Sequence, residues 1–164
     1  MKRLTLFSVV LTAVFFCAES FAQGPAKPYK ATYSSDFKMG KSALATRILE
    51  VWKDWDDNQL DRHDYFADTV TMMFSDGMVM KGKKENLEAA KKYRGSFTKV
   101  VSTVHAWMPL TSNDRKEDAV CIWGQEVNTL PDGKEETRDI HEVWWFNKDG
   151  KISSMRQWTA KFGQ

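Results

Sequence analysis

The chain has 164 residues, with 24 Lys and Arg against 22 Asp and Glu, which gives a formal net charge of +2. This length suits a single domain that buries its core without disulfide or metal support. Lysines and glutamates alternate between residues 81 and 92, and no run of basic residues is dense enough to neutralise a row of phosphates. The composition therefore argues against a nucleic-acid partner, and the lack of a glycine-rich phosphate loop argues against a nucleotide cofactor.

Residues 1–22 have the pattern of a cleaved signal peptide. Two basic residues precede an apolar run of about 15 residues, which is shorter than the roughly 20 residues that span a bilayer. Ser20 and Ala22 place small residues where signal peptidase reads the chain. We predict cleavage near Ala22 and a periplasmic or secreted protein. Cys121 would then be the only thiol, so the domain would have no internal disulfide and would depend on packing.

The N-terminal half predicts an extended arm, three helices and a hairpin. Prolines and glycines interrupt residues 23–40, which predicts the arm, and the domain itself is expected over 41–164. Apolar residues recur at helical spacing after Ser42, which we expect to cap the first helix. The further elements are a short helix capped by Asp61 and ending at Tyr65-Phe66, a strand over 69–74, a two-residue turn at Asp76-Gly77, a strand over 78–80 and a helix over 85–97.

The C-terminal half alternates apolar and polar residues with a period of two, which predicts a meander of four strands over residues 100–108, 119–128, 137–146 and 152–162. The sequences at 131–133 and 147–150 both suit a type I turn with glycine in the left-handed position. The predicted fold class is α+β: a cone-shaped, curved antiparallel sheet, made of a short hairpin and a four-strand meander, with three helices on one face.

These two turns also predict the register of the meander, and with it the side chains that lie opposite each other. Glu142 opposite Arg156 is either an acid kept ionised and aimed at a substrate or a buried pair that satisfies two polar side chains. No second carboxylate is expected beside Glu142 on the inner face, and Glu126 with Arg138 is interpreted as a pair at the rim of that face. The predicted opposite residues are Leu130 with Lys134, Glu126 with Arg138, Ile122 with Glu142, Phe146 with Ile152, and Glu142 with Arg156.

Both faces of the predicted sheet are partly apolar, and three helices suffice to cover only one of them. We therefore predict that the second face forms a symmetric homodimer; the alternative is that the N-terminal arm covers it. The expected inner residues are Ile122, Gly124, Ile140, Glu142, Trp144, Phe146, Ile152, Ser154, Arg156 and Trp158. The expected outer residues are Cys121, Trp123, His141, Val143, Trp145 and Met155, of which Trp123, Val143, Trp145 and Met155 are assigned to the dimer interface.

Residues 43–162 resemble the nuclear transport factor 2-like superfamily in the order of their elements and in the residues Phe66-Ala67-Asp68 at the end of the short helix. The last hairpin, which reads EVWWFNKDGKISSMR from Glu142 to Arg156, is similar to the closing hairpin of ketosteroid isomerases and SnoaL-like polyketide cyclases. The resemblance implies a cone with a pocket inside. It does not select one activity, because the superfamily includes isomerases, dehydratases, epoxide hydrolases and transport factors.

Compared with the isomerases, Glu142 falls on the acid that donates a hydrogen bond to the developing oxyanion, and Trp144 and Phe146 fall on two phenylalanines of the pocket wall. The isomerase's general base falls at or near Phe74, which cannot take a proton. The resemblance thus implies an inward-facing Glu142 but argues against steroid isomerisation by that mechanism.

The candidate site residues combine one acid, one base and many aromatic side chains. Strand 100–108 has no turn that fixes its register, so its side chains face either the pocket or the outside. The histidines lack metal-ligand spacing and Cys121 has no base beside it, so we predict neither metal nor cofactor. The catalytic candidates are Glu142 and Arg156, and the ligand-binding candidates are Trp52, Trp55, Phe74, His105, Trp107, Ile122, Trp144 and Trp158.

The sequence favours an exported protein that binds a hydrophobic small molecule in an aromatic pocket. The first alternative is a lyase, isomerase or hydrolase acting on a hydrophobic carbonyl or cyclic compound, with Glu142 as acid or base and Arg156 stabilising negative charge. The second alternative is an envelope protein that binds other proteins through the dimer face. Whether the chain is an enzyme is left open by its sequence.

Overall fold

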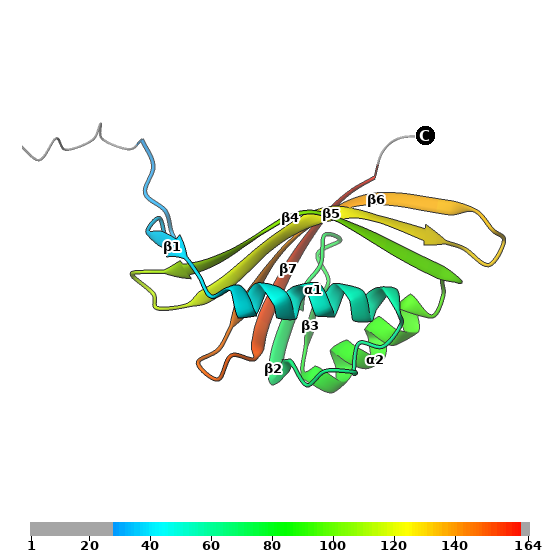
Figure 1. The fold of residues 1–164 in the computed structure, drawn as a ribbon, viewed down its shortest axis with the longest axis horizontal. Coiled ribbons are helices and arrows are strands. Elements are labelled where there is room, and N and C mark those ends of the chain that lie inside the picture. The colour runs from blue at the N-terminus through cyan, green and yellow to red at the C-terminus, as the bar shows by residue number, and fades with distance from the viewer. Residues whose placement is uncertain (1–27, 162–164) are drawn as a thin grey trace, which may run out of the picture. The chain divides into compact units, whose positions relative to one another are not determined.

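The computed structural model describes residues 28–161, and its main compact unit begins at Tyr33. The described residues form one sheet of seven strands with two helices on one of its faces (Figure 1). The predicted signal peptide lies outside the described residues. The elements are β1 (Phe37–Met39), α1 (Ser42–Asp56), β2 (Phe66–Met73), β3 (Val79–Lys81), α2 (Lys83–Arg94), β4 (Lys99–Ser112), β5 (Asp118–Thr129), β6 (Glu135–Phe146) and β7 (Ile152–Lys161).

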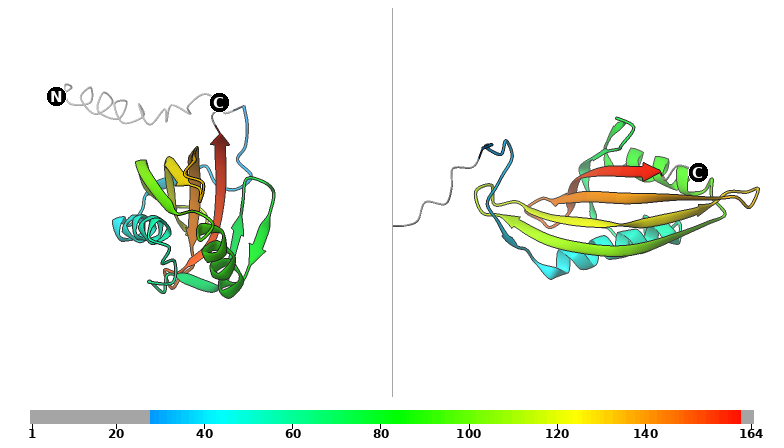
Figure 2. Two further views of the ribbon diagram at one scale, coloured as in Figure 1. Left: turned by 90° about the vertical axis from the view of Figure 1, so that its right-hand side faces the viewer. Right: turned by 90° about the horizontal axis from the view of Figure 1, so that it is seen from above.

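The strand order is β1-β4-β5-β6-β7-β2-β3, so the predicted meander and hairpin belong to a single sheet. The long strands β4, β5 and β6 are antiparallel and arch over the two helices (Figures 1 and 2). The hairpin β2–β3 joins the sheet through a parallel contact between β2 and β7. The short strand β1, which belongs to the predicted arm, pairs with the end of β4. The α+β class and the curved sheet are confirmed, whereas its purely antiparallel character is not.

Three hairpins close with the same three-residue turn. In each, the backbone N–H before the turn donates to the carbonyl after it, and the glycine N–H donates back to the carbonyl of the first residue. The glycines adopt φ angles of 88°, 85° and 73°, which only glycine reaches without a steric penalty. The turns at 131–133 and 147–150 are confirmed, and the turn at Asp76-Gly77 has three residues rather than two. The residues that close the turns are Phe74 and Met78, Leu130 and Lys134, and Asn147 and Lys151.

The predicted short helix at Asp61 is wrong: residues 57–65 form turns, and Phe66 already belongs to β2. Five or six residues are too few to nucleate a stable helix. Polar groups of this segment instead bind to neighbouring elements, because Arg62 and His63 contact Asp54 of α1. The domain thus has two helices over the sheet among its described residues, not three.

Helix α1 packs its apolar stripe against the inner face of the sheet. Leu44, Ile48, Val51 and Trp52 are buried there, as their helical spacing predicts. The predicted cap is wrong, because Ser42 is the first helical residue and no side chain caps this helix. Figure 2 shows both helices on the same side of the sheet.

The register predicted between β5 and β6 is confirmed, but that between β6 and β7 shifts by one residue. Ser153 is an extra residue in β7, a bulge between the residues opposite Trp145 and Phe146. A shift of one residue turns every later side chain to the other face. The predicted pair of Glu142 and Arg156 is therefore wrong. The observed pairs are Glu126 with Arg138, Ile122 with Glu142, Phe146 with Ile152, Glu142 with Gln157 and Val143 with Arg156.

Because of the bulge, the faces predicted for part of β7 are wrong. Ser154, Arg156 and Trp158 lie on the outer face rather than the inner one. Met155 is only 3% exposed and packs in the core, so its assignment to the dimer interface is wrong.

Gly124 of β5 permits the close contact between α1 and the sheet. A Cβ atom there would lie 3.1 Å from Cζ3 of Trp52 and would clash with the carbonyl oxygen of Thr103 on β4. The backbone of β5 cannot move away without breaking its hydrogen bonds to β4, so a side chain at position 124 is destabilising.

We expect Gly124→Ala to lower the free energy of unfolding by about 1–3 kcal/mol, the usual range for overpacking a core. The control is Lys148→Ala, at an exposed position in a turn. Urea denaturation of both variants measures the difference. Equal unfolding midpoints for Gly124→Ala and the wild-type protein would contradict this account.

Candidate functional site

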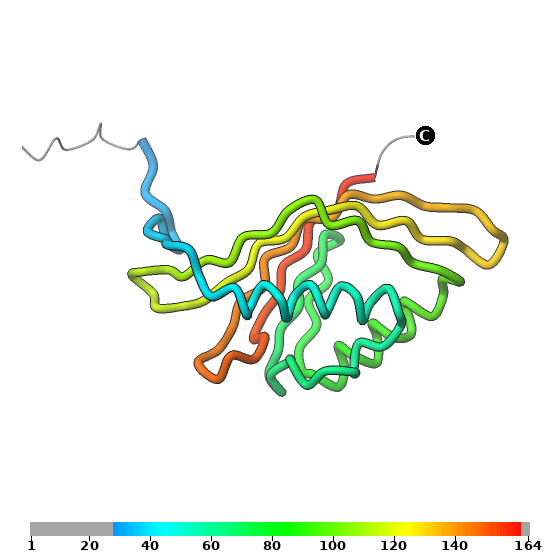
Figure 3. Tube along the Cα trace, in the orientation of Figure 1, coloured from blue at the N-terminus to red at the C-terminus, as the bar shows by residue number. Residues whose placement is uncertain are grey.

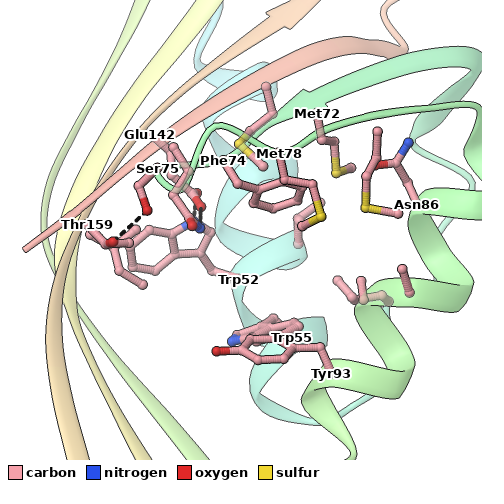
Figure 4. Close-up of a pocket in the computed structure, with 18 of the residues that line it drawn as sticks. Trp52, Trp55, Met72, Phe74, Ser75, Met78, Asn86, Tyr93, Glu142 and Thr159 are labelled. Carbon is pink, nitrogen blue, oxygen red and sulfur yellow. Dashed lines mark hydrogen bonds between the residues drawn. The ribbon is translucent and has the colours of Figure 1, made fainter.

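A cavity of about 330 Å³ lies between the two helices, the β2–β3 hairpin and the inner face of the sheet (Figure 4). This volume lies within the range of sites for small organic molecules. Ten of the 25 residues that line it are aromatic or methionine, and Met side chains adapt to ligands of different shape. The aromatic wall residues are Trp52, Trp55, Phe66, Phe74, Tyr93 and Trp144, and the methionines are Met72, Met78, Met80 and Met155.

The tip of the β2–β3 hairpin closes one end of the cavity. Figure 3 shows this tip next to the C-terminal part of β7. The hydroxyl groups of Ser75 and Thr159 lie 2.8 Å apart in a hydrogen bond that joins the tip to β7. Met78 is 47% exposed although it lines the cavity, so the hairpin tip borders the solvent.

Glu142 is the buried polar centre of the cavity wall, with 5% of its surface exposed. Its Oε2 accepts hydrogen bonds from the indole N–H groups of Trp52 at 2.8 Å and Trp144 at 2.9 Å. Its Oε1 accepts one from the side-chain amide of Gln157 at 2.8 Å. The carboxyl group thus has three donors and, among the ion pairs of residues 28–161, no basic partner.

Burial raises the pKa of the Glu142 carboxyl above its ordinary value. The donors Gln157, Trp52 and Trp144 lower the pKa in part, and the negative charge of Glu126 raises it further. The hydrogen bonds fix the position of the carboxyl group, while the missing cation leaves its negative charge uncompensated.

Glu126 is a second buried carboxyl group on the same cavity wall, 4% exposed. Its Oε2 accepts a hydrogen bond from the indole N–H of Trp55 at 2.6 Å, and its Oε1 accepts one from the amide of Asn128 at 2.6 Å. Nε of Arg138 lies 3.7 Å from Oε1, and an Arg138 Nη1–H donates to the hydroxyl of Tyr93. Glu126 therefore has the cation that Glu142 lacks.

The rim assignment of Glu126 and Arg138 is therefore wrong, since Glu126 lies inside the cavity. The sequence did indicate that Glu126 faces inward, because the turn at 131–133 places residues 122, 124 and 126 on one face and pairs Glu126 with Arg138. Trp52 and Trp55 are three residues apart on α1, so one helix face presents an indole N–H to each carboxyl group.

Four of the eight predicted ligand-binding residues line the cavity, and the other four lie elsewhere. Ile122 is fully buried in the core, and Trp107 is 50% exposed on β4 away from the cavity. His105 and Trp158 line a shallow depression on the outer face. Arg156 is exposed on that face, so it is not a partner of Glu142. The predicted residues that line the cavity are Trp52, Trp55, Phe74, Trp144 and Glu142; their roles stay predictions.

Among residues 28–161, no group of three His, Cys, Asp or Glu side chains is arranged to hold a metal ion. Burial raises the pKa of the Cys121 thiol, which keeps it protonated and a poor nucleophile. No described helix is long and apolar enough to cross a membrane.

Neither a protein-family model nor a curated protein matches the chain. Solved structures match it along most of their length. An NTF2-like protein of unknown function from Burkholderia pseudomallei aligns with a TM-score of 0.60 and 14% identity, over 73% of this chain and 92% of the other. A SnoaL-like protein of unknown function from Burkholderia thailandensis aligns with a TM-score of 0.55 and 16% identity, over 75% of this chain and 99% of the other.

The epoxide hydrolase/cyclase-like enzyme SalBIII, which has a role in pyran ring formation in the polyether salinomycin, aligns with a TM-score of 0.57 and 18% identity, over 73% of this chain and 92% of the other. The chain has the nuclear transport factor 2-like fold, and the predicted resemblance is confirmed at that level. Identities this low establish the fold alone.

The raised pKa of Glu142 makes stability depend on pH. The native state binds the Glu142 proton more tightly than the unfolded state, whose carboxyl titrates near the ordinary value of 4.5. The stabilising contribution is complete below pH 4.5 and is lost as the pH rises through the higher, native pKa. We expect the free energy of unfolding of the wild-type protein to fall over this window relative to that of Glu142→Gln. Urea titrations of both proteins between pH 4 and 8 measure the difference; parallel curves would refute the assignment.

Proposed function

We propose that the chain binds a hydrophobic small molecule in the cavity between the helices and the inner face of the sheet. The observation that carries the proposal is the wall itself: sixteen of the 25 residues around a space of about 330 Å³ are aromatic, methionine or aliphatic, and nine are polar. Apolar surface buried on binding contributes roughly 25 cal/mol per Å², so an apolar ligand of this size gains enough to bind without a dense polar network.

The polar groups in the wall would orient the bound ligand. Glu142 and Glu126 lie along one side of the cavity, each held by an indole N–H from α1. A few fixed polar groups in an apolar wall are typical of ligand sites, because they orient a molecule whose affinity comes from apolar contact. The ring-forming role named for SalBIII makes cyclic compounds the first class to test.

A second candidate function is acid or base catalysis at Glu142. Burial and a raised pKa are typical of carboxyl groups that act as acids or bases in catalysis. Arg156 has no part in this function, because it lies on the other face. Glu142→Gln distinguishes the two functions: a binding protein keeps most of its affinity, whereas an enzyme loses turnover and still binds.

We also propose that the protein acts after export, on the strength of the signal-like residues 1–22.

Filling the cavity tests the principal proposal. Ala90 of α2 lines the cavity, and we expect Ala90→Trp to weaken binding of the neutral dye N-phenyl-1-naphthylamine at least tenfold, because the indole occupies the space of the ligand. The matched control is Ala43→Trp on the exposed first turn of α1, which should bind as the wild-type protein does. Dye fluorescence gives the affinities and circular dichroism verifies folding. Unchanged affinity in a folded Ala90→Trp protein would contradict binding in the cavity.

We further propose that the outer face of the sheet packs against a second copy of the chain. Both helices lie on the inner face, and apolar side chains from β4 to β7 stay accessible on the outer face. The exposed fractions are 42% for Val101, 38% for Met108, 38% for Trp123 and 46% for Trp158. Trp145 and Val143 lie half-buried on the same face.

Sedimentation velocity tests this interface. We expect the wild-type domain to sediment with twice the mass of one chain and Trp123→Lys to shift it toward the monomer, because a buried lysine ammonium without a partner is strongly unfavourable in an apolar interface. Lys148→Ala, in an exposed turn away from this face, is the control. A wild-type protein that stays monomeric at high concentration would refute the dimer.

A further inference from the structure

The charges on the cavity wall are unbalanced. Among the residues that line it, Asp76, Glu126 and Glu142 are acids, and Arg138 is the one permanently charged base. Arg138 lies 3.7 Å from Glu126 and 3.5 Å from Glu136, so its charge is already shared between two carboxylates. Asp76 belongs to the exposed turn at the hairpin tip. The uncompensated charge inside the cavity is that of Glu142.

The polar atoms of the wall that could still form a hydrogen bond are mostly acceptors. Asn86 of α2 is 2% exposed, and its Nδ2 donates to the carbonyl of Gly82, while its Oδ1 is buried without a partner. Oε1 of Glu142 accepts a single hydrogen bond, from Gln157, which leaves acceptor capacity on that oxygen. Buried acceptors without donors are unfavourable and are usually satisfied by a ligand or by water. Nε of Arg138 is a buried donor without a hydrogen bond, but it faces Glu126.

The aromatic wall has the electrostatics that a cation prefers. The ring faces of Trp, Tyr and Phe carry partial negative charge, and a cation over such a ring is attracted to it most strongly where water is excluded. Trp52 and Trp144 lie at Glu142 because both donate to its carboxyl group, and Phe74 lies on the same wall (Figure 4). Both indoles point their N–H edges at this carboxyl group, so an ion beside Glu142 would have aromatic rings as neighbours and would meet a ring face only to one side of those edges.

From these observations we propose that the ligand of the cavity is a hydrophobic ammonium compound whose charged nitrogen lies beside Glu142. The apolar body of the ligand would fill the space between Met72, Met155 and the two helices. This inference rests on the proposed function, which it narrows to a class of ligand. A neutral ligand would leave the ionised form of Glu142 without a cation beside it, so it would favour the protonated carboxyl group.

The affinity for such a cation depends on pH. A cation requires the ionised form of Glu142, so its affinity rises as the pH increases through the native pKa of this carboxyl group and falls below it. The other titratable groups on the wall are Asp76 at the mouth, Tyr93, and Glu126 with Arg138. A neutral ligand of the same shape lacks this dependence on Glu142.

The test compares 1-naphthylmethylamine with 1-naphthylmethanol, which have the same ring and a donor at the same place but differ in charge. Each is used to displace N-phenyl-1-naphthylamine from the mature domain, residues 23–164, between pH 5 and pH 8. At pH 8 we expect the ammonium compound to bind at least tenfold more tightly than the alcohol, with the ratio shrinking toward pH 5. In Glu142→Gln we expect the ratio to approach one.

An alcohol that binds as tightly as the ammonium compound across the pH range, or a preference that persists in Glu142→Gln, would overturn the inference and leave the proposed function intact. Failure of the dye and of both naphthalene compounds to bind would instead overturn the proposed function, and the inference with it. If Glu142→Gln does not fold, the pH dependence of the wild-type ratio decides: a constant ratio overturns the inference.

Discussion

The burial of the Glu142 carboxyl group is the constraint on which the rest of the cavity depends. An isolated carboxylate in an apolar wall is strongly unfavourable, so it needs donors from several elements at once. Trp52 reaches it from α1, Trp144 from its own strand β6, and Gln157 from β7. These three hydrogen bonds join the helix and two strands at one point and hold the aromatic rings that line the cavity. The same group thus stabilises the wall and supplies its charge.

The two carboxyl groups of the cavity have similar burial but different partners. Glu126 has an arginine within ion-pair distance, and Glu142 has neutral donors only. This asymmetry gives the cavity one end with a balanced charge and one end without, which is why a charged ligand group has a single preferred place in it.

The bulge at Ser153 decides which side chains of β7 belong to the cavity. Without it, Arg156 would face Glu142, and the pocket would hold a closed ion pair. With it, Gln157 and Met155 face inward, and Arg156 lies outside. A bulge removes a cation from the site without changing the sequence on either side of it, because the side-chain period of a strand is two. The outer face gains Trp158 by the same shift, which extends its apolar surface.

The sequence by itself determined the α+β class, the first helix, the order of the strands and the register across Leu130 and Lys134, because turn chemistry and periodicity are local properties. It also placed Glu142, Trp52 and Trp144 inside. Tertiary structure decided what local rules do not encode. Phe66 became a strand residue because β7 offered it a partner, and the bulge at Ser153 reversed Arg156 because no local signal marks an extra residue in a regular strand. Trp55 donates to Glu126 because α1 packs over this face of the sheet, a contact that the register of the hairpin does not encode.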